Sequence, residues 1–236
     1  MFVQSVCHPE LILLTSSVED QLNRLSTSQA TSSSSFSSSV CQKLGGLRDL
    51  YENVDDLLQL PLTQQALSHE QHRKKVEEIL DGSLRLVDVC GTTRDLFSQI
   101  KECVQELESF VRRKRGDGSN LADQFSQNLV RMQKKSTSNE EFNQVAAIST
   151  LTQVEVISLE VFESLLVASD INQLENLDVE LLQLVNKKPN KEINLQCLLK
   201  QVEALELNIQ RVEQDLECIY RRMVKTRVSL LNFVNH

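Results

Sequence analysis

Tryptophan is missing from this chain of 236 residues, and aromatic, glycine and proline residues are few. Aromatics make up 4 % of the residues, and only six glycines and three prolines are available for tight turns. This scarcity disfavours a fold of many short strands joined by turns. Apolar residues still reach 40 %, mostly leucine, valine and isoleucine, so the chain can bury a core and long helices are favoured.

Positive charge is also in short supply, because 25 Lys and Arg face 33 Asp and Glu and leave a net charge of −8. This balance argues against nucleic acid as a partner. No apolar run approaches the roughly 20 residues that cross a bilayer, and Met1 to Pro9 contains no basic segment ahead of an apolar one. We therefore expect a cytoplasmic protein, with plastid or membrane association as the alternatives.

Paired cysteines are lacking as well. The six cysteines stand singly within helical patterns and form no Cys-x-x-Cys motif, so neither a zinc site nor a disulfide framework is indicated. Cys90 and Cys103 fall on one expected helix, about 20 Å apart at the helical rise, and cannot form a disulfide. All six are predicted to be free thiols: Cys7, Cys41, Cys90, Cys103, Cys197 and Cys218.

Apolar spacing divides the chain into three parts. Residues 1–25 hold an N-terminal segment and a first amphipathic helix. In residues 26–39 eleven of fourteen positions are Ser or Thr, which indicates a flexible linker and a candidate phosphorylation segment. Residues 40–236 are expected to form one helical bundle domain.

Two helices with regular three-and-four spacing are expected early in that domain. Ser39 and Gln42 match a capping box ahead of the first, which Pro61 ends or kinks. Ser68 and Gln71 repeat this signature before a long helix that reaches Val111. Within the long helix the expected kink lies at Cys90 to Thr93, because Gly91 weakens the helix there.

Further helices are expected at residues 119–135, from Phe142 onward, and at residues 170–185, although Val154 to Val161 also carry strand-like alternation. The last helix has the clearest pattern. Its apolar stripe has one polar exception, Thr226, and comprises Leu195, Leu198, Val202, Leu205, Ile209, Val212, Leu216, Ile219, Met223, Thr226, Leu230 and Phe233.

That stripe could pair with a second chain or with helices of its own chain. Its flanks include Leu199, Tyr220 and Val234, and Arg222 with Arg227 would repel across a parallel dimer. The stripe is therefore wider than a two-stranded coil needs. The sequence predicts an all-α fold, an elongated bundle of long antiparallel amphipathic helices with coiled-coil-like packing, and favours a monomer.

Catalytic, cofactor and metal sites are not predicted, and we expect no enzyme. His69 and His72 stand three apart at a helix start, but they lack the four-residue spacing of zinc proteases and are interpreted as surface residues. The acid pairs Asp55–Asp56, Glu77–Glu78 and Glu140–Glu141 are expected to be solvated faces, because adjacent helical residues point about 100° apart. The glycine-rich stretches Gly45–Gly46 and Gly116–Gly118 lack the Lys-Ser/Thr of a phosphate loop and do not follow a strand, so nucleotide binding is not indicated.

Arg112 to Arg115 form a basic run at the end of the long helix. The favoured interpretation is that these cations complement the negative end of the helix dipole. A nuclear-import signal or an anionic-lipid contact is the alternative for this run.

Three stretches, 32–67, 80–115 and 216–236, carry a family resemblance. They contain Leu57-Leu58-Gln59-Leu60-Pro61-Leu62-Thr63-Gln64-Gln65-Ala66-Leu67, Asp81-Gly82-Ser83-Leu84-Arg85-Leu86, and Lys225-Thr226-Arg227-Val228-Ser229-Leu230-Leu231-Asn232. Together they resemble the plant-specific family of unknown biochemical function related to the BYPASS proteins. The chain departs from the family pattern in two places. Met1 to Leu14 lacks the usual Ser/Arg/Pro-rich lead into the first helix, and the Trp-bearing segment expected near Ala168 to Asp170 is missing.

The resemblance implies an all-helical plant protein associated with root and shoot development, without catalytic residues to carry over. The leading hypothesis is a non-enzymatic scaffold or regulatory protein that binds an as yet unknown protein partner through a helical face. The alternative is a peripheral membrane protein that binds anionic lipid through the basic helix end and Lys134–Lys135.

Overall fold

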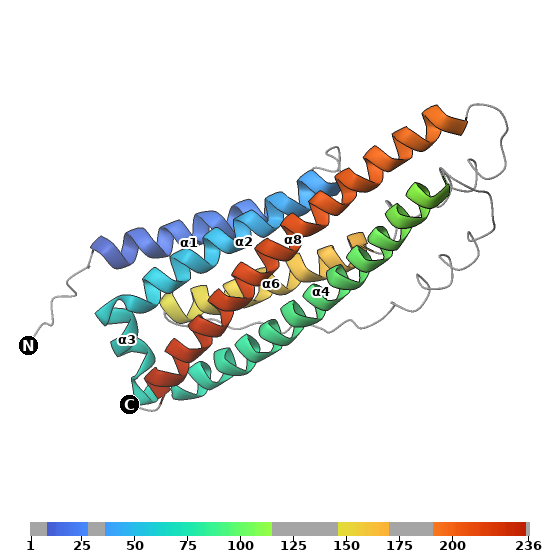
Figure 1. Ribbon diagram of the computed structural model, residues 1–236. Helices are drawn as coiled ribbons and strands as arrows, with labels where there is room; N and C mark the ends of the chain where they lie inside the picture. The colour runs from blue at the N-terminus through green and yellow to red at the C-terminus, as the bar shows by residue number, and fades with distance from the viewer. Residues whose placement is uncertain (1–8, 28–35, 115–145, 170–190, 235–236) are drawn as a thin grey trace, which may run out of the picture.

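The computed structural model describes residues 9–27, 36–114, 146–169 and 191–234, and these residues form helices without any strand. The predicted all-α fold is confirmed (Figure 1). The elements in chain order are α1 (Pro9–Thr27), α2 (Phe36–Gln59), α3 (Pro61–Leu67), the 3-10 turn η2 (Glu70–His72), α4 (Arg73–Lys114), α6 (Ala146–Ser169) and α8 (Lys191–Val234).

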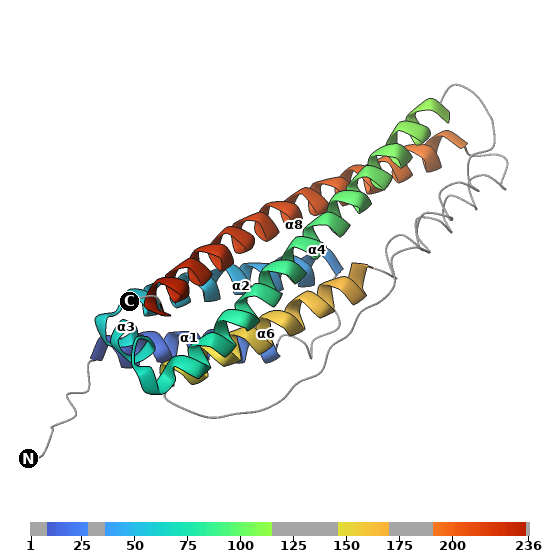
Figure 2. The same cartoon turned by 90° about the horizontal axis from the view of Figure 1, so that it is seen from below.

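The bundle is elongated, and α4 and α8 form its longest pair, with 42 and 44 residues. These two helices run antiparallel and extend together beyond the ends of α1, α2 and α6 (Figures 1 and 2). Helices α1, α4 and α6 run in one direction, and α2 and α8 run in the other. The neighbouring pairs α4–α8, α1–α2 and α2–α6 are therefore antiparallel, whereas α2–α8, α4–α6 and α1–α6 lie side by side in parallel.

The apolar stripes predicted from spacing form one core inside this chain. The stripe of α8 is buried against α2 and α4 rather than left open for a second copy. Its fully covered members extend from Val202 to Leu230, and the stripe of α2 faces part of them. Buried apolar residues of these two helices include Val40, Leu44, Leu47, Val54, Leu58, Val202, Ile209, Val212, Leu216, Ile219, Met223 and Leu230.

Helix α1 packs on α2 and α6 through Val18, Leu22 and Leu25, all of which are buried. A Cβ atom at Gly46 would lie 2.8 Å from Leu25 Cδ2, so the glycine permits the close approach of α1 to α2. Helix α1 ends at Thr27 and α2 begins at Phe36, so helical structure reaches into both ends of the predicted linker 26–39.

Helix α6 resolves the ambiguity between helix and strand at Val154 to Val161 in favour of helix. It carries no basic residue, and it is buried on several sides by α1, α2 and α4. A helix that is apolar around most of its circumference is expected in such an enclosed position. Its buried residues include Ala147, Ile148, Leu151, Val154, Ser158, Val161, Phe162 and Leu165.

Two predicted helix starts are wrong. Ser39 lies inside α2, which already begins at Phe36. Ser68 follows the end of α3, and it is His69 that precedes the next turn, where its Nδ1 accepts the backbone N–H of Gln71 at 3.4 Å. Short polar residues fit a cap sequence at several adjacent positions, so local spacing alone misplaces the cap.

Other boundaries agree with the sequence. Helix α2 ends at Gln59 and α3 starts with Pro61 in its first turn, where a missing N–H costs nothing. Helix α4 continues through Gly82 and Gly91. The helices predicted at residues 119–135 and 170–185 lie outside the described residues. Within the described ranges no helix is both long and apolar enough to cross a membrane.

Candidate functional site

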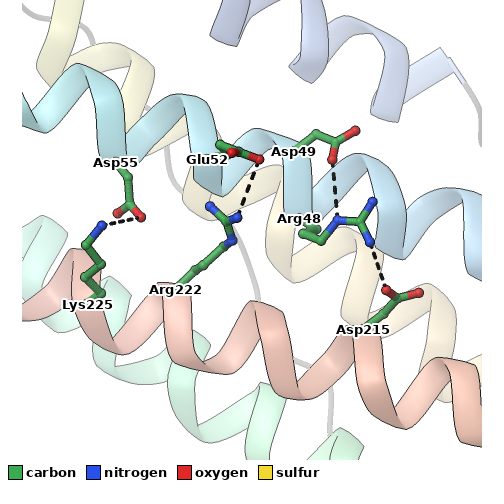
Figure 3. Close-up of polar contacts among 7 residues, drawn as sticks. All are labelled: Arg48, Asp49, Glu52, Asp55, Asp215, Arg222 and Lys225. Atoms are coloured by element: carbon green, nitrogen blue, oxygen red, sulfur yellow. Dashed lines mark hydrogen bonds and ion pairs between the residues drawn. The ribbon is translucent and has the colours of Figure 1, made fainter.

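Ion pairs connect α8 to α2 along one flank of α8 (Figure 3). The residue numbers rise together on the two helices, which reflects their parallel direction. Because each pair sits about two turns or less from the next, the row fixes the axial position of α8 against α2. The nitrogen–oxygen distances are 3.2 Å for Arg48–Asp215, 3.5 Å for Arg222–Glu52 and 3.1 Å for Lys225–Asp55.

Asp55 is the most enclosed carboxylate of this row, and its side chain is only 10 % exposed. Its Oδ2 accepts a hydrogen bond from Lys225 Nζ at 3.1 Å, and its Oδ1 accepts one from Thr226 Oγ1 at 3.2 Å. Thr226, the polar exception in the predicted apolar stripe, therefore satisfies a buried acceptor. A partly buried charge needs such partners, because its lost hydration is otherwise uncompensated.

The opposite flank of α8 is linked to α4 in the same manner. Arg94 Nη2 lies 2.6 Å from Glu217 Oε2, and the Arg94 guanidinium carbon lies 4.8 Å from the centre of the Tyr220 ring. Lys101 Nζ and Ser98 Oγ both donate to Glu213, at 2.7 and 3.0 Å. These contacts hold the antiparallel pair in register.

An open groove of about 900 Å³ runs over α8 between these two flanks. Its lining includes Cys218 but no histidine, and each of its five cations lies within ion-pair distance of a carboxylate. Paired charges leave little net field for an anionic ligand, and the described lining supplies no nucleophile–base pair. Its cations are Arg94, Lys101, Arg221, Arg222 and Lys225.

A second polar cluster lies inside the bundle, where α2 meets α6. The hydroxyl of Tyr51 lies 3.3 Å from Ser158 Oγ, and Ser158 Oγ donates to the carbonyl of Val154 at 2.6 Å. Since the serine proton is used in that bond, Tyr51 is the donor between the two hydroxyls. Burial raises the pKa of Tyr51 above its usual value and keeps the phenol neutral.

Near this cluster, Glu155 of α6 contacts helix α4. Its carboxylate pairs with Arg85 Nη2 at 2.9 Å and lies directly over Gly82, where any Cβ atom would clash with it. Burial raises the pKa of Glu155, and Arg85 opposes that shift. The adjoining cavity measures about 30 Å³ and is bordered by Tyr51 and Thr226. Sequence reasoning missed this contact, although a glycine inside a long helical pattern was the available signal.

Arg227 joins α8 to α4 near this cavity. Its Nη1 donates to the carbonyl of Leu80 and, at 3.0 Å, to Ser83 Oγ. Arg227, which counts in the sequence against a parallel dimer, thus contacts α4 of its own chain. The turn of α8 around Arg227 is thereby placed beside the turn of α4 around Ser83.

Most of the polar residues considered in the sequence analysis do not form a catalytic or metal-binding group among the described residues. The His69 and His72 rings lie 5.9 Å apart, and no group of three potential metal ligands occurs in the part of the chain that the structure describes. Of the two acid pairs in the described residues, the prediction of a solvated face is wrong for Asp55, which is buried and paired with Lys225. It is confirmed for Asp56, Glu77 and Glu78, which are exposed, and Glu77 also pairs with Arg73. Gly45–Gly46 lie within α2, and Glu140–Glu141 and Gly116–Gly118 lie outside the described residues.

The described residues include four of the six cysteines and part of the basic run Arg112 to Arg115. Cys41, Cys90, Cys103 and Cys218 are free, and burial raises the pKa of Cys90 to about 12. Arg112 pairs with Glu108 at 2.5 Å and with Glu203 at 3.4 Å. Arg113 Nε donates to the Ser109 carbonyl at 3.1 Å, which supports the role of these cations at the C-terminal end of α4.

Comparison with known proteins returns one family. The model of the family described as Protein BPS1 matches residues 43–169 and 167–233. Those ranges contain the α2–α8 ion pairs, the Tyr51–Ser158 contact and the Gly82–Glu155 approach. No curated protein and no solved structure matches the chain significantly.

Proposed function

Because the chain belongs to the BPS1 family, we propose that it is a non-enzymatic helical scaffold or regulatory protein in plant root and shoot development signalling. The observation that carries this proposal is an exposed apolar face on α8. Val224, Val228 and Leu231 are spaced four and three apart and are exposed to solvent. Side chains repeated in this way line one helix face, and an exposed apolar cluster is typical of a protein-interaction surface.

The charged groove over α8 supports the same proposal, because its charged groups are engaged in ion pairs. Its cations, from α4 and α8, are paired with carboxylates of α2 and α8, so its polar groups hold the helices in place rather than converge on a substrate. A rigid face built on long helices is a suitable platform for a partner. Binding through such a face needs neither a cofactor nor a catalytic group.

The test is recovery of a partner from growing roots. A tagged chain, expressed at native level, is purified alongside the tag alone and alongside a tagged helical bundle of similar charge. The proposal expects at least one protein that co-purifies reproducibly with the chain and with neither control. Repeated purifications that yield only the background of the controls would remove its basis.

A rival function, anionic-lipid binding through the basic helix end, rests on Arg112 and Arg113 at the end of α4. Their contacts to Glu108, Glu203 and the Ser109 carbonyl reduce the charge that is free for a membrane. Flotation with vesicles of anionic lipid decides between the two functions, because the scaffold proposal expects the chain to remain unbound. The proposed location is the cytoplasm, and a fluorescent fusion in root cells checks it.

A further inference from the structure

The outer side of the α4–α8 pair combines an apolar patch with unpaired negative charge. The patch consists of Leu84 on α4 and Val224, Val228 and Leu231 on α8, all of them exposed. Arg227 contacts Leu80 and Ser83, so the α8 turn that carries the valines lies against the α4 turn that carries Leu84. Four apolar side chains from two neighbouring helices are thus gathered beside one another.

A row of acids extends from this patch along α4. Asp81, Asp88, Asp95 and Glu102 are each seven residues apart and exposed, and none has an ion-pair partner among the described residues. Seven residues are nearly two helical turns, so these carboxylates lie on one face at intervals of about 10 Å. Leu84 stands between the first two of them.

The surrounding cations do not cancel this row. On α8, Arg221 is paired with Glu217 and Lys225 with Asp55. On α4, Arg85 is paired with Glu155, and the exposed Lys74 stands one heptad before Asp81. The free charge that runs away from the patch is therefore negative and points toward a basic partner.

We propose that this face, the acidic row together with the apolar patch, binds a basic amphipathic helix of a partner protein. The interval of the row selects a helix, because a partner helix repeats a face every seven residues at about 10 Å. Alternate residues of a strand repeat at about 7 Å and would fall out of step with the carboxylates. Lys or Arg at heptad spacing would meet the acidic row, and a leucine-type stripe would cover the patch.

Other occupants fit the charge less well. A second copy would bring the same acidic row against this one, and a surface of anionic lipid would likewise be repelled. The proposal rests on the scaffold function and specifies the chemistry of its partner.

A direct binding test uses a synthetic peptide of four heptads with a leucine stripe and lysine at one flanking heptad position. The control peptide carries glutamate in place of each lysine. Fluorescence anisotropy with the full chain is expected to show binding of the lysine peptide that weakens with added salt, and little binding of the glutamate peptide. Equal binding of both peptides, or of neither, overturns the proposal.

Matched variants locate the binding. The triple variant Asp88→Asn, Asp95→Asn, Glu102→Gln removes three charges from the row and is expected to weaken the lysine peptide about tenfold or more. The control Glu10→Gln, Glu19→Gln, Asp20→Asn removes three exposed, unpaired charges from α1 and is expected to leave affinity unchanged. Val228→Ser should weaken binding, whereas Leu13→Ser, which alters a more exposed residue on α1, should not.

The same variants separate this inference from the scaffold function. If the natural partner from roots is lost with the acidic-row variant and kept with the α1 control, both the scaffold function and the assigned binding face are supported. If the wild-type chain recovers a partner that the row variant also retains, the scaffold function stands and the assigned face is wrong. A dimer in sedimentation that the row variant dissociates would assign the face to a second copy and overturn the proposal.

Discussion

Helices α6 and α8 are held in the bundle by different means. Helix α6 has no basic residue and is enclosed by α1, α2 and α4, with buried side chains from Ala147 to Leu165. Helix α8 buries one stripe and carries ion pairs on both flanks, toward α2 and toward α4. Apolar burial holds α6 against its neighbours. Helix α8 is also held by apolar burial, but ion pairs fix its axial position against α2 and α4.

The difference teaches which contacts specify position. On α6 the polar contacts to α2 and α4 include Lys43 with Ser164, Tyr51 with Ser158 and Arg85 with Glu155. An apolar helix can slide or rotate with little loss of burial unless such contacts define one arrangement. On α8 many weak ion pairs share that role.

The largest expected effect is a cavity in α6. Phe162 is fully buried, and Phe162→Ala should lower the free energy of unfolding by about 3–5 kcal/mol, because both transfer energy and packing are lost. Leu207→Ala on α8, where the side chain is 57 % exposed, should change it by less than about 0.5 kcal/mol. Urea unfolding measures both, and similar losses at the two positions would contradict the contrast.

The next effect tests the most enclosed ion pair of α8. Asp55→Ala leaves the Lys225 ammonium and the Thr226 hydroxyl without their acceptor and should cost about 1.5–3 kcal/mol. The double variant with Lys225→Ala should recover part of this loss, because the unpaired cation is gone. Additive losses in this cycle would show that the pair does not interact.

Tyr51→Phe removes the hydroxyl between α2 and α6 and should cost about 0.5–1.5 kcal/mol at neutral pH. Because burial raises the pKa of Tyr51, its stabilising contribution is complete below the ordinary tyrosine value and decreases as pH rises above 10.0. The wild type should therefore lose stability more steeply than the variant above that pH. Parallel pH profiles of unfolding would refute the burial of a neutral phenol at this position.

A glycine pair on α4 sharpens the comparison further. No atom would meet a Cβ at Gly91, so Gly91→Ala should stabilise the protein by about 0.5–1 kcal/mol through helix propensity. Gly82→Ala should fail to give this gain, because the Glu155 carboxylate occupies the space and must leave Arg85. In a Glu155→Ala background the gain should return, as thermal unfolding of the four variants will reveal.

The smallest effect is expected at the exposed end of the α2–α8 row. Arg48 is 42 % exposed, and Arg48→Ala should cost about 0.2–1 kcal/mol, with most of that difference screened at high salt. A loss as large as that of Asp55→Ala would mean that burial does not rank these pairs. Unfolding at low and high salt provides the measurement.

Much of the fold follows from spacing alone, because a stripe repeated every three and four residues must be covered. This holds for α2, α4 and α8, and Pro61 marks a boundary for a local steric reason. The N-terminal caps at Ser39 and Ser68 were placed wrongly, since neighbouring polar residues satisfy the same local pattern. Cap identity depends on where tertiary packing starts the helix.

The sequence indicates which residues are expected to make polar contacts within the bundle, but not which partners they contact. The sequence indicates that Thr226 interrupts an apolar stripe, but its acceptor Asp55 is 171 residues away and is set by the parallel packing of α2 and α8. The approach of Glu155 to Gly82 likewise needs the relative rotation of α4 and α6. Pair contacts of this kind depend on helix order and azimuth, which single-helix periodicity does not contain.

The parallel seating of α8 on α2 has a consequence for biosynthesis. The contacts from Arg48 to Asp215 and from Asp55 to Lys225 close only after about 170 intervening residues have been translated. At typical synthesis rates of about 5–20 residues per second, the α2 side chains that pack on α8 stay without that cover in the nascent chain for roughly ten seconds or more. The burial of this part of α2 is therefore completed only in the last stage of synthesis, when α8 has been translated.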